Sequence, residues 1–412
     1  MNHQDPNIVI IGMGTVGKVL ASAFAKKRNA RTYSLHLIGR TEQSTHDIAD
    51  RIRDLYGMTA LRHVCDARQT DSLIERLLEI NPAIVINVAT PDTHVSVMRA
   101  CLEVGAHYLD TAVFELPGDF NVAAPWYNHE LALREQFRQK GLTAILSIGF
   151  DPGVVNVFCA KVRNDYLDCI DSIDILCANA GVHNQFFATN FNAAVNLKEL
   201  CENTGYWQQG AWHSSPPFSR SMAFNFPAIG MQKLYSVGHD EVHSLSMNIP
   251  KARIEFWMRV GDQFRSTFEV LKNVGMLSLA PIEVGAERIS PLDFLARVLP
   301  SPQTFANEYR GTVCVGALIS GTKTGKPETV FMHSVCNHED CYQDLETQVT
   351  AYTTALPAMA ATLLVLDGEW DVGTMVHPEE LPPDPFLDRI RELGLDWHVT
   401  YPSSRPEPTF NT

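Results

Sequence analysis

Long apolar runs are missing from this sequence of 412 residues, and so is any excess of positive charge. We find no run of the roughly 18 consecutive apolar residues that a membrane-spanning helix needs, and the N-terminal MNHQDPN is too polar for a signal sequence. Asp and Glu total 47 against 33 Lys and Arg, and the net charge of −14 disfavours nucleic acid as a partner. We therefore expect a soluble, cytoplasmic protein with no nucleic-acid or membrane partner.

Cysteine occurs nine times, but without the regular spacing of a disulfide framework. Scattered thiols of this kind are typical of a reducing compartment. Cys336, His338 and Cys341 offer three metal ligands within CNHEDC, yet their spacing is not that of a C-x-x-C knuckle and no second ligand pair follows. We predict structural thiols at these positions and no metal.

A glycine-rich turn follows a short apolar stretch in NIVIIGMGTVG, residues 7–17. The G-x-G-x-x-G pattern stands between a predicted strand and a predicted helix, which is the context in which this motif binds a dinucleotide. The pyrophosphate is then expected at the helix N-terminus, where free N–H groups favour negative charge. We assign Gly12, Gly14, Thr15, Val16 and Gly17 to cofactor binding.

Arg40 indicates which dinucleotide is bound. It follows a second strand, residues 34–38, and precedes Thr41, at about the place where NAD-binding domains carry an acidic residue for the ribose hydroxyls. A guanidinium here pairs with the 2′-phosphate of NADP through two charge-assisted hydrogen bonds. Arg40 and Thr41 therefore predict NADP(H), the alternative being that Arg40 is a solvated surface residue.

Strands and helices alternate up to about residue 150 and predict a doubly wound parallel sheet of six strands. The continuous apolar strand at 83–89 is of the kind that is buried on both faces of such a sheet. Ligands bind beyond the carboxyl ends of the strands, so we expect further cofactor contacts in the loops there. The residues assigned on this basis are Asp66, Ala67, Asn87, Ala89, Thr90, Thr111, Ala112, Phe150 and Pro152.

The chain is too long for one compact core, so we predict an α/β protein of two domains. Residues 1–150 form the NADP-binding Rossmann domain, and longer alternating runs predict an α+β domain with a mixed, largely antiparallel sheet over 151–345. The last segment, 346–412, begins in a predicted helix at 345–366 that Pro357 starts or kinks. We expect this helix to return to the first domain and the Pro-rich tail to fray.

Several segments together resemble the saccharopine dehydrogenase superfamily and, within it, the carboxynorspermidine synthases, also called carboxynorspermidine or carboxyspermidine dehydrogenases. The resemblance spans nearly the whole chain, and its most specific parts are GFDPG, FATNF and CNHEDCY in that order. The segments are VIIGMGTVGKV at 9–19, HYLDTAVFELP at 107–117, GFDPGVVNVF at 149–158, HNQFFATNF at 183–191, GYWQQGAW at 205–212, FWMRVGD at 256–262, VLKNVGM at 270–276 and SVCNHEDCYQDLETQVTAYTTALPAM at 334–359.

The resemblance implies a reductase that condenses L-aspartate 4-semialdehyde with 1,3-diaminopropane or putrescine and reduces the imine with NADPH, giving carboxynorspermidine or carboxyspermidine. It also implies a homodimer. A saccharopine or other opine-type dehydrogenase, which takes an amino acid as the amine, stays open because fold cannot separate the two. A non-enzymatic alternative is an NADP(H)-binding redox sensor.

Imine reduction requires positioning of the substrate and control of one proton, since the cofactor supplies the hydride. Asp110 ends a strand and could orient the substrate amine, or it could close that strand in an Asx-type turn. Asp151 in GFDPG could act at the site or cap the helix that follows. His239 could be a general acid near neutral pH or make only structural hydrogen bonds. We assign these three residues as catalytic candidates.

Substrate-binding candidates are polar residues near these loops. Glu115 is a candidate for the distal ammonium of the diamine, and Asn156 for contact with substrate or cofactor. In the second domain, Asn190 of FATNF and Glu241 of GHDEV offer further polar groups. Recognition of the α-carboxylate of the semialdehyde asks for a cation, for which we choose Arg253 among several arginines.

Overall fold

The computed structural model describes residues 5–28, 32–115, 126–403 and 405–410, and it divides into two compact units. Of the described residues, unit 1 contains those up to 115 together with 126–161 and 351–396, and unit 2 contains those of 162–350 and 397–410. Residues 398–400 and 409–410, near the end of the chain, pair with the sheet of unit 2.

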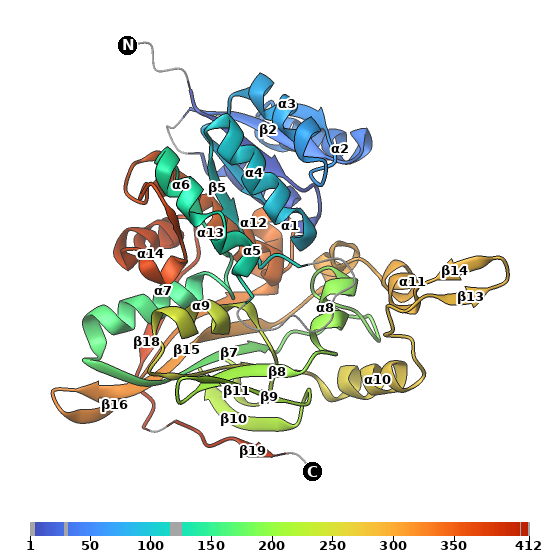
Figure 1. Cartoon of the computed structure of the whole chain (residues 1–412). Coiled ribbons are helices and arrows are strands. Elements are labelled where there is room, and N and C mark those ends of the chain that lie inside the picture. The colour runs from blue at the N-terminus through green and yellow to red at the C-terminus, as the bar shows by residue number, and fades with distance from the viewer. Residues whose placement is uncertain (1–4, 29–31, 116–125, 404, 411–412) are drawn as a thin grey trace. The chain divides into compact units, whose positions relative to one another are not determined.

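Unit 1 is built on a parallel sheet of seven strands in the order β17-β6-β5-β4-β1-β2-β3 (Figure 1). The doubly wound α/β fold is thus confirmed, with one strand more than predicted. The seventh strand, β17, comes from near the end of the chain and pairs with β6. The strands are β1 (Asn7–Ile11), β2 (Ser34–Gly39), β3 (Leu61–Val64), β4 (Ile84–Asn87), β5 (His107–Asp110), β6 (Ala144–Ile145) and β17 (Met375–Val376).

Helices alternate with these strands, and local signals set their ends. In α2, for example, the Thr41 side chain accepts a hydrogen bond from the Ser44 backbone, and Gly57 ends the helix in the left-handed conformation. Two short helices, α5 and α6, lie between β5 and β6 in the chain. The helices of unit 1 are α1 (Thr15–Lys26), α2 (Glu42–Tyr56), α3 (Thr70–Ile80), α4 (His94–Val104), α5 (Asn128–Leu131), α6 (Arg134–Lys140), α7 (Val154–Lys161) and α14 (Pro383–Glu392).

Helix α13, Val349–Leu366, is the most apolar helix described, and it starts four residues later than predicted. It is long and apolar enough to cross a membrane, but 83% of it is buried inside the protein. Leu356, Met359 and Leu364 are fully buried. Pro357 lies inside the helix rather than at its start. This helix is therefore a buried core helix.

Unit 2 is built on a ten-stranded sheet, ordered β18-β16-β15-β7-β12-β11-β10-β19 with β8 and β9 attached beside β12 (Figure 1). Only β7 and β12 pair in parallel, which confirms the mixed, largely antiparallel sheet. The strands are β7 (Cys169–Asn179), β8 (Thr204–Gln208), β9 (Ala211–Ser215), β10 (Arg220–Phe226), β11 (Gly230–Ser236), β12 (Arg253–Met258), β15 (Thr312–Lys323), β16 (Lys326–Asn337), β18 (His398–Thr400) and β19 (Thr409–Phe410).

The sheet of unit 2 curls strongly. Phe224 of β10 and Phe331 of β16 have ring centroids 5.0 Å apart, although four strands separate β10 from β16 in the sheet order. Trp257 lies in the same apolar cluster. The tail is not frayed as predicted, because β19 pairs with β10.

The helices of unit 2 are α8 (Ala193–Glu199), α9 (Asp240–Asn248), α10 (Asp262–Asn273), α11 (Pro291–Val298) and α12 (His338–Leu345). A separate hairpin, β13 (Ile282–Val284) and β14 (Glu287–Ile289), lies between α10 and α11 in the chain. This region carries several exposed apolar side chains, namely Val270, Val274, Ile282, Val284, Phe294 and Val298.

Candidate functional site

Of the three glycines in the turn between β1 and α1, one, Gly14, has open space beside it. A Cβ on Gly12, whose φ is +106°, would lie 2.4 Å from the Ala89 backbone nitrogen, and one on Gly17 would lie 1.8 Å from the Gly12 oxygen. A Cβ on Gly14 would meet nothing within 4 Å. Gly14 is exposed and caps α1, which has no side-chain cap and no acid in its first turn. The free N–H groups and open space here fit a pyrophosphate.

Arg40 follows β2 and is exposed, and Thr41 beside it caps α2. Within the described ranges, no hydrogen bond or ion pair of Arg40 is present, so its guanidinium is available to a ligand. The sequence-assigned Asp66 pairs with Arg68 by a 3.1 Å contact from Nε to Oδ1, and Ala67 is buried. The exposed guanidinium of Arg40 fits the predicted contact with a 2′-phosphate, whereas cofactor contacts of Asp66 and Ala67 stay predictions.

Replacing Arg40 with alanine should raise the KM for NADPH about 10- to 100-fold, because hydrogen bonds to charged groups contribute roughly 1.5–3 kcal/mol. The KM for NADH, which lacks the 2′-phosphate, should change little. Steady-state kinetics with both cofactors checks this. Arg53→Ala removes a cation from α2 that pairs with Asp50, and it should leave both KM values unchanged. Equal effects of Arg40→Ala on the two cofactors would contradict the assignment.

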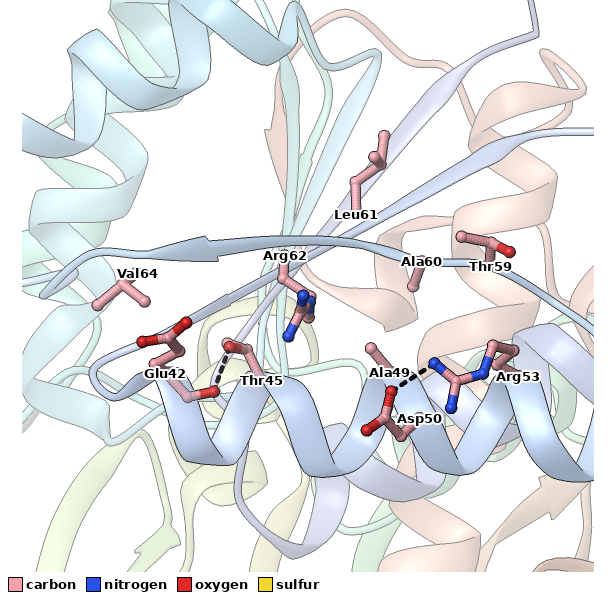
Figure 2. Close-up of a pocket in the computed structure, with 10 residues that line it drawn as sticks. All are labelled: Glu42, Thr45, Ala49, Asp50, Arg53, Thr59, Ala60, Leu61, Arg62 and Val64. Carbon is pink, nitrogen blue, oxygen red and sulfur yellow. Dashed lines mark hydrogen bonds and ion pairs between the residues drawn. The ribbon is translucent and has the colours of Figure 1, made fainter.

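A pocket of about 400 Å³ lies beside α2, between that helix and the edge strand β3. Figure 2 shows Asp50 and Arg53 paired along one wall and Arg62 directed toward the helix. The lining residues include none of those assigned to the cofactor. This pocket is therefore a feature separate from the glycine turn.

The carboxyl ends of β4 and β5 carry a buried polar network. The Asn87 side chain donates to the Thr93 hydroxyl at 3.1 Å and accepts from the Ala89 backbone at 3.2 Å, which orders the loop that contains Thr90. Asp110 is fully buried and accepts from the Ser147 backbone at 2.5 Å.

The other oxygen of the Asp110 carboxylate is also engaged. It accepts from the Tyr108 hydroxyl at 2.9 Å and lies 3.4 Å from Nδ1 of His94. Burial lowers the pKa of His94 to about 3, so this histidine is neutral. The geometry favours the alternative in which Asp110 closes the strand end and orders its surroundings, rather than contact with the substrate amine.

Asn156 also has a structural environment. Its side-chain oxygen accepts from the Gly153 backbone at 2.9 Å, and its nitrogen donates to Glu379 at 3.0 Å. Both Asn156 and Glu379 are buried. The GFDPG turn is thereby tied to residues 378–380 of unit 1, and nothing in this geometry supports a direct substrate contact by Asn156.

The remaining predicted residues of unit 1 lie in loops that follow strands or precede α7. Thr111, Ala112 and Glu115 follow β5 and are partly exposed. Asp151 is partly exposed in the turn before α7, where Phe150 and Pro152 are buried. Their contacts with cofactor or substrate stay predictions.

His239 and Glu241 of unit 2 form a close pair. Glu241 is fully buried, and its Oε2 lies 2.5 Å from Nδ1 of His239. The imidazole ring also stacks on Phe256 of β12 with centroids 4.0 Å apart. A buried carboxylate that contacts one ring nitrogen fixes the orientation of a histidine. Glu241 therefore orients His239. The predicted contact between Glu241 and substrate has no support in this geometry.

Arg253 is engaged in a buried ion network. Its guanidinium pairs with Asp174 and, at 2.6 Å, with Glu255. Arg220 contacts Glu255 at 2.7 Å, and Arg405 contacts Asp174 at 2.5 Å. Both carboxylates are fully buried. The choice of Arg253 for the substrate carboxylate was therefore poor, because this cation already has two anionic partners inside the fold.

A second polar cluster of unit 2 centres on Tyr309. Its hydroxyl donates to the Asn190 side chain at 3.0 Å and accepts from the Asn179 side chain at 2.9 Å. The His338 ring stacks on Tyr309 with centroids 3.6 Å apart, and its Nε2 lies 3.3 Å from Oδ1 of Asn179. The Gln348 side chain donates to the Asn190 carbonyl at 2.7 Å. Two of the segments behind the family resemblance, 183–191 and 334–359, thus meet here.

Sequence reasoning assigned Asn190 but missed Tyr309 and Asn179. Tyr309 directly follows a 3-10 helix, Pro302–Glu308, and lies outside every segment of the resemblance. Burial raises its pKa to about 12, so the hydroxyl keeps its proton. The only signal for Tyr309 in the sequence is that it lies between two segments of the resemblance, 270–276 and 334–359.

In the CNHEDC segment, the ring nitrogens of His338 face partners inside the protein. Nδ1 of His338 accepts from the Val349 backbone at 3.3 Å, and Nε2 faces Asn179. Cys341 is buried, and burial raises the pKa of its thiol. No cluster of three potential metal ligands is present in the residues that the structure describes, and the nine cysteines, all of them described, form no disulfide.

The parallel sheet, the open space at Gly14, the exposed Arg40 and the match to a saccharopine dehydrogenase NADP binding domain identify an NADPH-dependent oxidoreductase with a second, mixed-sheet unit. The saccharopine dehydrogenase NADP binding domain matches residues 8–145, and the saccharopine dehydrogenase C-terminal domain matches residues 149–395. The chain belongs to the saccharopine dehydrogenase family.

Curated relatives are similar over nearly their whole length. The chain is 38% identical to the carboxynorspermidine synthase of Vibrio alginolyticus, covering 95% of this chain and 96% of that protein. It is 36% identical to the carboxyaminopropylagmatine dehydrogenase of Synechocystis, with the same coverage. The apo saccharopine dehydrogenase (L-Glu forming) of Saccharomyces cerevisiae shares the fold, with a TM-score of 0.70 at 14% identity, covering 96% of this chain and 100% of that one.

Proposed function

We propose that this enzyme condenses L-aspartate 4-semialdehyde with a short amine and reduces the resulting imine with NADPH, in polyamine biosynthesis. The observation that carries the proposal is the 38% identity to carboxynorspermidine synthases over nearly the whole chain. The glycine turn and Arg40 support the cofactor half of the reaction. The amine is 1,3-diaminopropane or putrescine, and the similar identity to a carboxyaminopropylagmatine dehydrogenase makes agmatine a further candidate.

The reaction has two stages whose atoms and electrons balance. The primary amine adds to the aldehyde carbon, and loss of water leaves a C=N bond. NADPH supplies a hydride, an electron pair with its hydrogen, to the imine carbon. The nitrogen gains one proton, and the product is a secondary amine.

His239 is our candidate for the group that manages this proton. Its Nδ1 is held by Glu241, so a proton on Nε2 is the one that can be transferred. The contact with Glu241 and the stacking on Phe256 hold the imidazole ring in one orientation. Tyr309, with its raised pKa, is better suited to hydrogen bonding than to proton transfer.

The experiment that tests the function is loss of NADPH absorbance with aspartate semialdehyde and each of 1,3-diaminopropane, putrescine, agmatine and lysine. We expect turnover with at least one of the first three amines and none with lysine. Turnover with lysine alone would favour an opine-type dehydrogenase. Tight NADPH binding without turnover on any amine would favour the redox sensor.

Two further properties stay predictions. We expect a homodimer, and the exposed apolar side chains on α10, β13, β14 and α11 are the surface that supports association most directly. We expect the soluble protein to be cytoplasmic, as its scattered thiols suggest.

A further inference from the structure

Arg259 lies just beyond the end of β12, and its guanidinium is held in one orientation by neutral acceptors. Nε donates to the Gln232 side chain at 2.8 Å, and Nη1 donates to the Asn179 carbonyl at 2.7 Å. The Arg259 backbone N–H also donates to the Cys177 carbonyl at 2.8 Å. These three hydrogen bonds fix the backbone of Arg259 and the orientation of its guanidinium.

The charge of Arg259 has no anionic partner in the part of unit 2 that the structure describes, although the residue is only partly exposed. Two other partly or fully buried cations of the unit, Arg253 and Lys198, do have anionic partners. Arg253 has Asp174 and Glu255, and Lys198 lies 3.7 Å from Glu202. Removing a cation from water without a counter-ion is unfavourable. A fixed, unpaired and partly buried guanidinium is therefore suited to an anion from outside the protein.

Arg259 belongs to a cluster of polar side chains. Asn179, which accepts from Arg259 through its carbonyl, reaches Tyr309 and His338 through its side chain. The charge of Arg259 acts on the Tyr309 hydroxyl, where it opposes the effect of burial on the pKa. Burial lowers the pKa of His338 to about 4, so this ring is neutral. Arg259 is thus the positive member of an otherwise neutral cluster.

We propose that Arg259 binds the α-carboxylate of the aldehyde substrate, an assignment that rests on the proposed function. A planar guanidinium presents paired N–H donors that match the two oxygens of a carboxylate. Two of the five N–H donors are used within the protein, and the others are available. Arg259 takes the role that Arg253 cannot fill, and it distinguishes an amino-acid aldehyde from a simple aminoaldehyde.

The test compares aspartate semialdehyde with 3-aminopropanal, which has the same aldehyde and amine but no carboxylate. In Arg259→Gln the KM for aspartate semialdehyde should rise about 10- to 100-fold, the usual effect of losing a hydrogen-bonded charge partner. The KM for NADPH and the kcat/KM for 3-aminopropanal should stay as in the wild type. The preference of the wild type for aspartate semialdehyde should therefore be lost. Arg259→Lys keeps the positive charge but lacks the paired N–H donors of a guanidinium. It should lose part of the preference for aspartate semialdehyde.

Arg265→Gln is the matched control, because Arg265 lies nearby in the chain but pairs with Glu269 on the surface of α10. It should retain the wild-type preference. If Arg259→Gln also retains that preference while the wild type turns over aspartate semialdehyde, the carboxylate assignment is wrong and the proposed function stands. If the wild type does not turn over aspartate semialdehyde with any amine, both are wrong. An equal loss on both aldehydes with a lower melting temperature would indicate a structural role and overturn the assignment.

Discussion

Replacing Asp174 with alanine should lower the free energy of unfolding by about 3–5 kcal/mol, the usual result of removing one partner from a buried ion pair. The carboxylate is fully buried. It accepts from Trp257 at 2.8 Å and from Nε of Arg405 at 2.5 Å, and it pairs with Arg253. Without it, two guanidinium groups lose their shared anion, and the tail loses its ionic contact with β7. Urea denaturation of the purified chain measures the change.

The Asp174 carboxylate also predicts how the stability of the protein changes with pH. Burial alone would raise the pKa of Asp174, but Arg253 and Arg405 outweigh it and hold the pKa below its ordinary value of 3.8. The folded state therefore binds this proton less readily than the unfolded state does. The stabilisation is present above the ordinary pKa and is lost as the pH falls through the folded-state pKa. The difference in the free energy of unfolding between the wild type and Asp174→Ala should therefore become smaller as the pH falls.

Glu269→Ala is the control for this prediction. Glu269 pairs with Arg265 at 3.0 Å, but its side chain is half exposed. Surface pairs contribute about 0–1 kcal/mol, so this variant should unfold near the wild-type midpoint. An Asp174→Ala midpoint as close to that of the wild type would mean that the buried network adds nothing to stability.

Most of unit 1 follows from local sequence signals, which is why its elements could be predicted. The strand predicted at 34–38 is β2 (Ser34–Gly39), because continuous apolar runs and turns act over a few residues. Strand β17 could not be found this way. Its two residues, Met375 and Val376, join the sheet by pairing with β6, more than 200 residues earlier in the chain.

Unit 2 is harder to predict because its features arise from long-range contacts. The tail looked frayed in sequence since it is rich in proline, yet Arg405 reaches Asp174 and β19 pairs with β10. The curl that brings Phe224 to Phe331 likewise depends on the whole sheet. Nothing near these residues in the sequence indicates either contact.

The candidate site shows the same contrast. The glycines of the cofactor turn form one contiguous motif, so Gly12, Gly14 and Gly17 could be assigned from their spacing alone. The substrate half is assembled from separate segments. Arg253 and Arg259 are six positions apart, and only the fold shows that the first is neutralised by Asp174 while the second is not.

Replacing Gly14 with valine should raise the Kd for NADPH at least about 100-fold, because two hydrogen bonds from backbone N–H groups to the pyrophosphate would be lost at roughly 1.5–3 kcal/mol each. The Gly14 backbone has φ −83° and ψ −161°, which any residue adopts. A Cβ there meets no protein atom within 4 Å, so valine would occupy only the space assigned to phosphate. Titration of NADPH by calorimetry measures the Kd.

Gly57→Ala is the complementary control, since Gly57 ends α2 at φ +65° with open space around its Cβ position. Alanine there should cost about 1 kcal/mol of stability through backbone strain and leave the Kd for NADPH unchanged. Gly14→Val should instead melt within a few degrees of the wild type. Together the two variants distinguish a turn that binds the cofactor from a turn that is only structural. If the turn is only structural, Gly14→Val should lower the melting temperature and leave the Kd for NADPH unchanged.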